Sequence, residues 1–263
     1  MSSPFTLMAT YNGTTITLTD HTDDYICEYT GLNPPAAVIA SQELYDRPGA
    51  MFVSQKSSVR NVVLQFSIMQ NVQTVREELY TVFKMGRNVS FTFNNGSAKG
   101  ILSFSGVCET FEFSQFSAPN GAVLQGVQIS ILCFDPYLYG AQITTNTASA
   151  ITYGGDYPVG FSLEYPFDYG SLMPSADVAF CTLTNGGTTF ECYFDIPEVE
   201  GSGTYVINSA TRHAQIQQSG GNTWITRYWR HGSVWPMLLP GSNTISPTNS
   251  NVVVKYKPAY MGV

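Results

Sequence analysis

The clearest pattern in the first half of the chain is a regular alternation of apolar and polar positions. Within Asn61–Met69, Val62, Leu64, Phe66 and Ile68 share one phase. A period of two indicates a strand that turns one face to the core. The same pattern predicts strands at Thr14–Thr19, Val89–Phe93, Ile101–Phe116 and Ala122–Cys133. Asn-Gly pairs at 12–13, 95–96 and 120–121 favour tight turns between these segments.

One segment of the first half has helical spacing instead. From Val75 onward, apolar residues recur at i, i+4, i+7 and i+8 across residues 74–85. This stripe predicts a helix that packs on a sheet. Thr74 and Glu77 have the spacing of a capping box, and Gly86 can end the helix. A single helix laid on a curved sheet gives the first half a mainly β fold with one α-helix.

A sharp corner follows the strand that ends at Cys133. Pro136 restricts Asp135 to extended conformations and donates no backbone hydrogen bond, so the sheet must stop there. Tyr137 and Tyr139 make the corner rich in tyrosine, and after Gly140 the sequence becomes a polar linker. We therefore expect two domains, residues 1–140 and 141–263. Asp135, Pro136, Tyr137 and Tyr139 are the predicted domain-junction residues.

The second half predicts only strands, separated by glycine-rich turns. The predicted segments are Asp177–Thr184, Thr188–Ile196, Gly203–Asn208, Arg212–Gln217, Thr223–Trp229 and Asn251–Lys257. Many short strands at even spacing indicate a β-sandwich or jelly roll. The last strand, at about 251–258, is a candidate to pack near the first domain, and Lys255 and Lys257 would suit a protected sheet edge.

Composition narrows the possible functions. Hydrophobic residues make up 43% of the chain and charged residues only 12%, which is compatible with a large core and with surfaces that pack in an assembly. The net charge of −7 argues against a dedicated nucleic-acid binder. No Lys or Arg occurs between Lys99 and Arg212, where eleven carboxylates fall. A solvated acidic face is the interpretation that the sequence alone favours.

The cysteines and the apolar segments bear on the environment of the chain. Five cysteines without metal-type spacing fit a reducing compartment. If Gly186-Gly187 forms a two-residue turn, Cys181 and Cys192 face each other, and we favour buried thiols over a disulfide. No apolar run has the length of a membrane span, and no signal peptide is evident, so we expect a soluble chain.

Sites for chemistry are few. The three histidines are scattered, and no catalytic triad or zinc motif can be assembled from them: His21, His213 and His231. Asp20, Asp23 and Asp24 could supply oxygen ligands for Ca²⁺, although the loop lacks the EF-hand pattern. A solvated turn is the alternative that we favour. We predict no enzyme activity, no cofactor and no metal.

An aromatic cluster in the second half is a candidate ligand or partner contact. Trp224 and Trp229 could stack on a sugar, and Arg227 and Arg230 could stack on the indoles or contact another chain. The alternative is that Trp224 and Trp235 fill the sandwich core. Exposed aromatic patches also mark protein contacts more often than sugar sites.

The order of these segments resembles the distal tail protein family of long-tailed bacteriophages, over nearly the whole chain. In the first half the resemblance rests on Gly31-Leu32-Asn33-Pro34-Pro35, on Asp46-Arg47-Pro48-Gly49-Ala50 and on the Asp135-Pro136 corner. In the second half it rests on Thr184-Asn185-Gly186-Gly187 and on Leu238-Leu239-Pro240-Gly241-Ser242-Asn243, which is similar to the family's Leu-x-Pro-Gly-x-Asn pattern.

The resemblance implies a structural virion protein. A first β-rich domain would form a hexameric ring, and a second, galectin-like β-sandwich would project outward. The implied partners are identical subunits, the tail tube protein, a tail-tip hub or tail-associated lysin, and receptor-binding or side-fibre proteins. The implied location is the tail tip of a virion assembled in the host cytoplasm. DNA would pass the lumen without specific binding, and we hypothesise that carboxylates near the Asp135 corner face that channel. The alternative function is a carbohydrate-binding module or adhesin.

Overall fold

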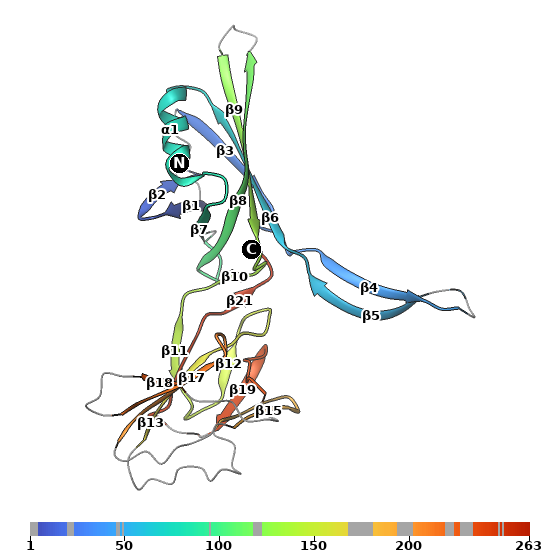
Figure 1. Cartoon of the computed structure of the whole chain (residues 1–263), viewed down its shortest axis with the longest axis vertical. Helices are drawn as coiled ribbons and strands as arrows, with labels where there is room; N and C mark the ends of the chain where they lie inside the picture. Colours follow the sequence, from blue (N-terminus) through green and yellow to red (C-terminus); the bar gives the residue numbers. More distant parts are fainter. Residues whose placement is uncertain are drawn as a thin grey trace. The chain divides into compact units, whose positions relative to one another are not determined.

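The structure, a computed structural model, describes residues 5–19, 24–45, 48, 50–94, 96–117, 123–167, 181–193, 202–218, 224–226, 234–246, 248 and 250–263. The chain forms two compact units (Figure 1). The first unit contains residues 1–140 together with 260–263, and the second contains residues 141–259. The chain therefore leaves the first unit once and returns to it at Tyr260.

The first unit is built on a nine-stranded antiparallel sheet. Its main path runs in the order β2-β1-β7-β8-β9-β6-β3, with β10 beside β8 and β21 beside β10. The bounds are β1 Thr6–Tyr11, β2 Thr14–Thr17, β3 Tyr25–Thr30, β6 Arg60–Ile68, β7 Asn88–Asn94, β8 Ile101–Ser117, β9 Val123–Cys133, β10 Leu138–Tyr139 and β21 Ala259–Tyr260. The alternation in the sequence correctly predicted β2, β6, β7, β8 and β9, with ends that differ by one or two residues.

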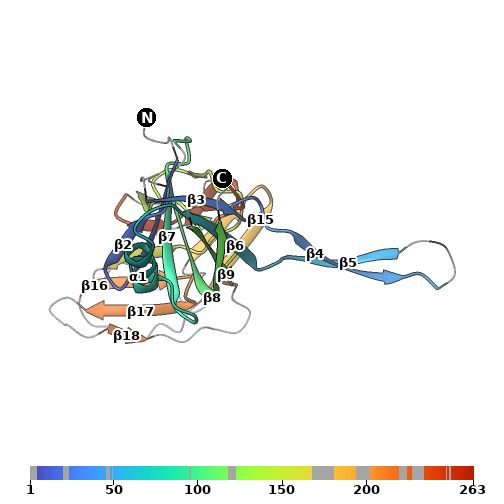
Figure 2. The ribbon, with the colours of Figure 1, turned by 90° about the horizontal axis from the view of Figure 1, so that it is seen from above.

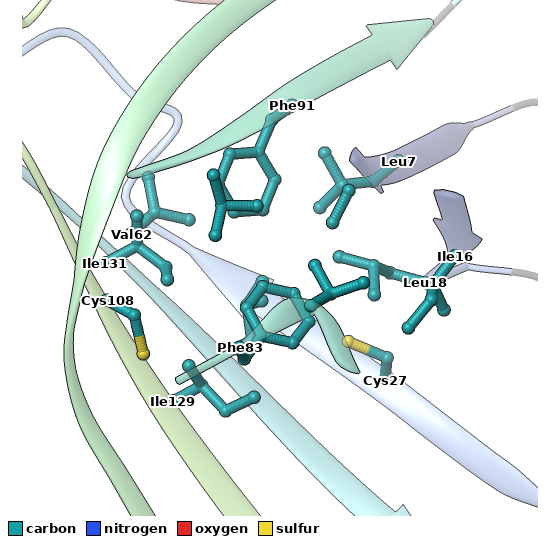
Figure 3. Close-up of a cluster of buried hydrophobic side chains, with 14 of the residues drawn as sticks. Leu7, Ile16, Leu18, Cys27, Val62, Phe83, Phe91, Cys108, Ile129 and Ile131 are labelled. Atoms are coloured by element: carbon teal, nitrogen blue, oxygen red, sulfur yellow. The ribbon is translucent and has the colours of Figure 1, made fainter. Parts of the chain in front are cut away.

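The buried phase of these strands forms one apolar core with helix α1. In β6, Val62, Leu64, Phe66 and Ile68 are buried, as the period of two requires. Phe83, directly after α1, points into the same cluster as Leu7, Cys27 and Ile129 (Figure 3). Three buried residues of α1 itself complete this core, namely Val75, Leu79 and Val82.

Helix α1 spans Val72–Val82, so the predicted start at Thr74 was wrong. The N-cap is Asn71, in a left-handed conformation and without a side-chain cap. Its side-chain amide instead donates to the Asp24 carboxylate at 2.9 Å. The main-chain carbonyl of Asp24 also accepts from the amides of Met69 and Gln70. This tertiary turn starts the helix two residues early, and the predicted Thr74–Glu77 capping box lies inside it.

A separate two-stranded hairpin, β4 (Ala37–Glu43) with β5 (Ala50–Ser57), extends from the first unit. We call it the arm. Both views show it leading away from the main sheet (Figures 1 and 2). The alternation did not predict it, because Val38-Ile39 and Met51-Phe52-Val53 are continuous apolar runs. The register shifts between Ala40 and Ser41, which leaves Val53 as a bulge between the paired residues Phe52 and Ser54.

The second unit is a β-sandwich, as predicted. A six-stranded sheet has the order β11-β20-β13-β16-β17-β18, and a four-stranded sheet has the order β12-β19-β14-β15. The bounds are β11 Ile143–Asn146, β12 Ile151–Tyr153, β13 Ser162–Phe167, β14 Cys181–Asn185, β15 Thr188–Cys192, β16 Gly203–Asn208, β17 His213–Gln218, β18 Trp224–Thr226, β19 Gly241–Ser246 and β20 Val253–Tyr256. Buried residues of both sheets, such as Leu163 and Leu183, form its core.

The segment 251–258 belongs to this second unit. That it packs near the first unit stays a prediction. Strand β20 lies between β11 and β13, so it is not an edge strand. Lys255 does not protect an edge; it forms an ion pair with Glu164 on the neighbouring strand. The residues that return to the first unit are the last four of the chain, Tyr260–Val263.

The predicted cysteine pair is confirmed as two facing thiols. Cys181 lies opposite Cys192 in the β14–β15 hairpin, and Leu183 lies opposite Phe190. Both cysteines are fully buried and free of disulfides. Burial raises the pKa of the Cys181 thiol to about 12 and raises that of Cys192 as well. Both groups are therefore protonated at neutral pH and behave as small apolar side chains.

The Leu-Pro-Gly-Ser-Asn sequence at 239–243 is organised by the fully buried Asn243. Its side-chain oxygen accepts from the Leu239 amide at 3.0 Å. Its side-chain nitrogen donates to the Leu239 carbonyl at 2.7 Å and to the Gly241 carbonyl at 3.0 Å. Asn185 donates to the same oxygen at 3.2 Å, which ties the β14–β15 hairpin to this turn. A buried amide thus closes the turn that precedes β19.

Asn243→Ala should destabilise the second unit, because it removes from a fully buried position the side chain that binds the Leu239 amide and the carbonyls of Leu239 and Gly241. We expect the free energy of unfolding to fall by about 2–4 kcal/mol. Trp224, Trp229 and Trp235 all belong to the second unit, so urea unfolding followed by tryptophan fluorescence reports on that unit alone. Ser242→Ala, at an exposed neighbouring position, is the control; equal losses in the two variants would contradict this explanation.

Candidate assembly surfaces

Arg60 is the buried charge that holds the corner of the first unit together. It begins β6, lies opposite Cys133 and is 3% exposed. Its Nε donates to the Pro136 carbonyl at 2.8 Å, and its Nη1 donates to the carbonyls of Gly31 and Asn33, both at 2.8 Å. Its Nη2 donates to the Met261 carbonyl at 2.6 Å. Four segments that are distant in the sequence therefore meet at one guanidinium.

Burial lowers the pKa of Arg60, while Cys133 and Asp135 act in the opposite direction. A buried guanidinium keeps its charge, so burying it is costly unless its N–H groups find acceptors. Here main-chain carbonyls supply them. The sequence contained a signal that we did not use: Arg60 is in phase with the buried residues Val62 and Leu64, where an arginine is out of place unless it is paired.

The predicted junction residues come together at this corner, all within the first unit. The Asp135 carboxylate accepts from the Tyr137 amide at 3.2 Å and from the Tyr139 hydroxyl at 2.7 Å. The Tyr137 hydroxyl is 3.2 Å from the Ser57 hydroxyl, at the end of the arm. Asp135 thus closes a local turn, and Pro136 presents its carbonyl to Arg60. That these residues set the orientation of the second unit stays a prediction.

The Gly31-Leu32-Asn33-Pro34-Pro35 segment is shaped by close packing against β6 and by its hydrogen bonds to Arg60. Gly31 has a φ of +92° and passes so close to β6 that an added Cβ would lie 2.0 Å from the Asn61 carbonyl oxygen. Only glycine fits there. Leu32 is buried in the core, and the carbonyls of Gly31 and Asn33 on either side of it bind Arg60.

The arm exposes several large apolar side chains. Ile39 is 63% exposed, Phe52 60% and Val53 55%. All residues of β4 are exposed, as are all those of β5 except Ser57 at its end. An isolated two-stranded hairpin is only marginally stable in water. An exposed contiguous apolar surface of this kind indicates a protein contact.

The face of the main sheet opposite α1, which we call the polar wall, has the reverse character. One row crosses four strands in register: Glu28 faces Gln65, Gln65 faces Gln128, and Gln128 faces Glu112. In the next row, Ser130 lies near the Glu109 carboxylate. Apart from Arg60, which is in the buried phase, the main-sheet strands contain no Lys or Arg. The polar wall is therefore neutral to acidic.

The predicted ligand residues of the second unit are only partly described. Trp224 lies in β18, where its backbone pairs with that of Gln217. Arg227, Trp229 and Arg230 lie outside the described residues, so a contact with a sugar or a partner stays a prediction. Trp235, expected in the sandwich core, is half-buried.

The proposed Ca²⁺ ligands are likewise only partly described. Asp20 and Asp23 fall outside the described ranges, whereas Asp24 binds Asn71. Within the described part of the chain, no group of three or more potential metal ligands is found. In the same part of the chain, no helix has both the length and the apolarity that crossing a membrane would require.

Comparison with solved structures identifies the fold. Over 97% of its length, the chain matches 98% of the Dit (gp 19.1) protein of SPP1, with a TM-score of 0.64 and 14% sequence identity. That protein is described as a paradigm of the hub adsorption apparatus in phages that infect Gram-positive bacteria. The chain thus has the fold of a phage distal tail protein, across both units.

Other comparisons are weaker. Two structures of the phage P2 baseplate in its activated conformation, with Ca and with Sr, match at TM-scores of 0.46 and 0.48 and 9% identity, values too low to support an argument. No family model matches the sequence, and no curated protein matches it.

Arg60→Met should loosen the corner, because the carbonyls of Gly31, Asn33 and Pro136 lose their donor. We expect the first unit to lose about 3 kcal/mol of stability. Hydrogen exchange of peptides from β6 would then be roughly 100-fold faster. Lys84→Met, which removes an exposed charge, should leave exchange unchanged; a similar effect of the two variants would rule out the assigned bonds.

Proposed function

We propose that this chain is a structural protein of a phage tail, which forms a ring at the distal end of the tail. The exposed apolar arm is the observation that carries the proposal. It is supported by the fold, which is that of the SPP1 Dit protein over both units. A hexamer is the ring size that the resemblance implies.

In this ring, the arm of each subunit binds the next subunit. Identical subunits close a ring when one surface binds a different surface of the neighbour, repeated until closure. A projecting hairpin with Ile39 and Phe52 exposed suits such a contact, because its apolar residues become buried only in the assembly. The two free edges of the hairpin can also add main-chain hydrogen bonds.

The polar wall lines the lumen in this proposal. DNA binds proteins chiefly through Lys and Arg contacts to phosphate. A wall of hydroxyl, amide and carboxylate groups offers no such contacts and repels the polyanion weakly. Glu28, Glu109 and Glu112 replace the Asp135 corner as the carboxylates best placed for this purpose, since they occupy the exposed phase of one sheet face.

The ring joins the tail tube on one side to a tail-tip hub or tail-associated lysin on the other. The second unit serves as a platform for receptor-binding or side-fibre proteins. Such a protein acts by assembly, without catalysis, and its place is the tail tip of the virion. The β-sandwich of the second unit is consistent with this role, since its organising groups, Asn243 and the facing thiols, are buried structural residues.

Phe52→Asp should prevent assembly of the oligomeric ring, because it places a charge in the interface that would bury the Phe52 side chain. We expect the wild type to form a closed oligomer, a hexamer by mass, and Phe52→Asp to remain monomeric. Native mass spectrometry measures both. Val234→Asp is the matched control, because Val234 in the second unit is similarly exposed, at 52%. A wild type that stays monomeric at high concentration would refute the proposed function.

Adding lysines to the polar wall should make the ring retain DNA. We expect wild-type rings to show no measurable binding to duplex DNA at about 50 mM salt, and rings with Gln65→Lys and Gln128→Lys to bind with a steep salt dependence. Gln73→Lys with Thr74→Lys adds the same charge at exposed positions on α1. If these control rings bind DNA equally well, the polar wall does not line the lumen.

A further inference from the structure

The segment Tyr260–Val263, which we call the strap, belongs to the first unit although it directly follows the second. Its contacts are specific. The Met261 carbonyl accepts from Arg60 at 2.6 Å, and the Gly262 carbonyl accepts from the Lys99 ammonium at 3.1 Å. The same ammonium lies 4.7 Å from the centre of the Tyr260 ring. Tyr260 is 9% exposed. We call the residues that contact the strap, Pro34, Arg60 and Lys99, its seat.

The fit at Gly262 is tight. An added Cβ there would lie 2.8 Å from Cδ and 2.9 Å from the nitrogen of Pro34. Both atoms belong to a rigid ring, so the strap and the Gly31–Pro35 segment can approach only because residue 262 is glycine. A larger side chain at this position must displace one segment or the other.

The strap seat is also the base of the arm. Pro34 precedes the first arm residue, Ala37, by three positions, and the Ala36 carbonyl accepts from the Ser58 amide at 2.9 Å. Arg60, which binds the strap, also binds the carbonyl of Pro136. The next residue, Tyr137, reaches Ser57 at the end of β5. The start of β4 and the end of β5 are therefore both next to residues that the strap helps to hold in place.

We propose that the strap couples the second unit to the arm: when it is seated, the base of the arm is ordered, and when it is withdrawn, the base loosens. Withdrawal leaves a buried Nη2 of Arg60 without its acceptor, which weakens the shared corner. The strap is joined covalently to β20 by Lys257, Pro258 and Ala259. A force on the second unit is therefore transmitted to the strap. Coupling is reciprocal, so an arm bound to its neighbour also tightens the strap.

This inference rests on the proposed function for its consequence, since a loosened arm would weaken the ring. A signal at the second unit, such as the binding of a fibre or receptor protein, could then change the strength of the ring contact. The coupling inside one subunit, however, can be measured without any ring.

Two variants empty the seat: deletion of residues 260–263, and Gly262→Val in the full chain. Hydrogen exchange of dilute, monomeric protein is followed in peptides that cover residues 33–37 and 56–60, which include the Ser58 amide. We expect exchange there to become about tenfold faster in both variants. The control Val263→Ser, at a residue 45% exposed, should leave it unchanged.

Each outcome decides a different claim. Peptides from β16 and β17 in the second unit should keep their wild-type exchange, which shows that the variants are folded. If the deletion fails to fold, Gly262→Val decides alone. Unchanged exchange at the arm base in Gly262→Val overturns the coupling, even if wild-type rings form. Faster exchange in a protein that never forms rings would uphold the coupling and overturn the proposed function instead.

Discussion

A guanidinium group that has left water must find acceptors for its N–H groups, and the corner of the first unit is arranged around this requirement at Arg60. The carbonyls of Gly31, Asn33, Pro136 and Met261 converge on it from three segments. Each bond alone is modest, but losing any acceptor leaves a buried donor unpaired. The position of the arm base, the end of the main sheet and the strap all depend on this one charge.

The two faces of the main sheet separate two physical tasks. The buried face carries Val62, Leu64 and their neighbours and supplies the hydrophobic free energy of the first unit. The polar wall presents the Glu28–Gln65–Gln128–Glu112 row on the opposite face of the same strands. The arm belongs to neither face. Its apolar residues have no core within the subunit, which is why we assign them to a neighbouring copy.

How far the sequence could predict these features differs from element to element. β6 was predictable because one of its faces is buried, so its side chains had to alternate. Helix α1 was predictable as an element, but its start was not, because Asp24 binds Asn71 from a distant part of the chain. The arm was missed because a hairpin with no buried face within the subunit has no reason to alternate. The buried phase of β6 marked Arg60 as unusual, but its partners could not be predicted because they are main-chain carbonyls, which every residue has.

The sequence by itself determined the β-rich class, helix α1, the β-sandwich and the facing pair Cys181 and Cys192, because each follows from local periodicity or from the register of one tight turn. The tertiary structure alone decided which segments meet at Arg60, that the chain returns to the first unit at Tyr260, and that β20 is an inner strand. These depend on contacts between residues that are far apart in the chain. Local patterns of hydrophobicity do not specify which distant residues will be in contact.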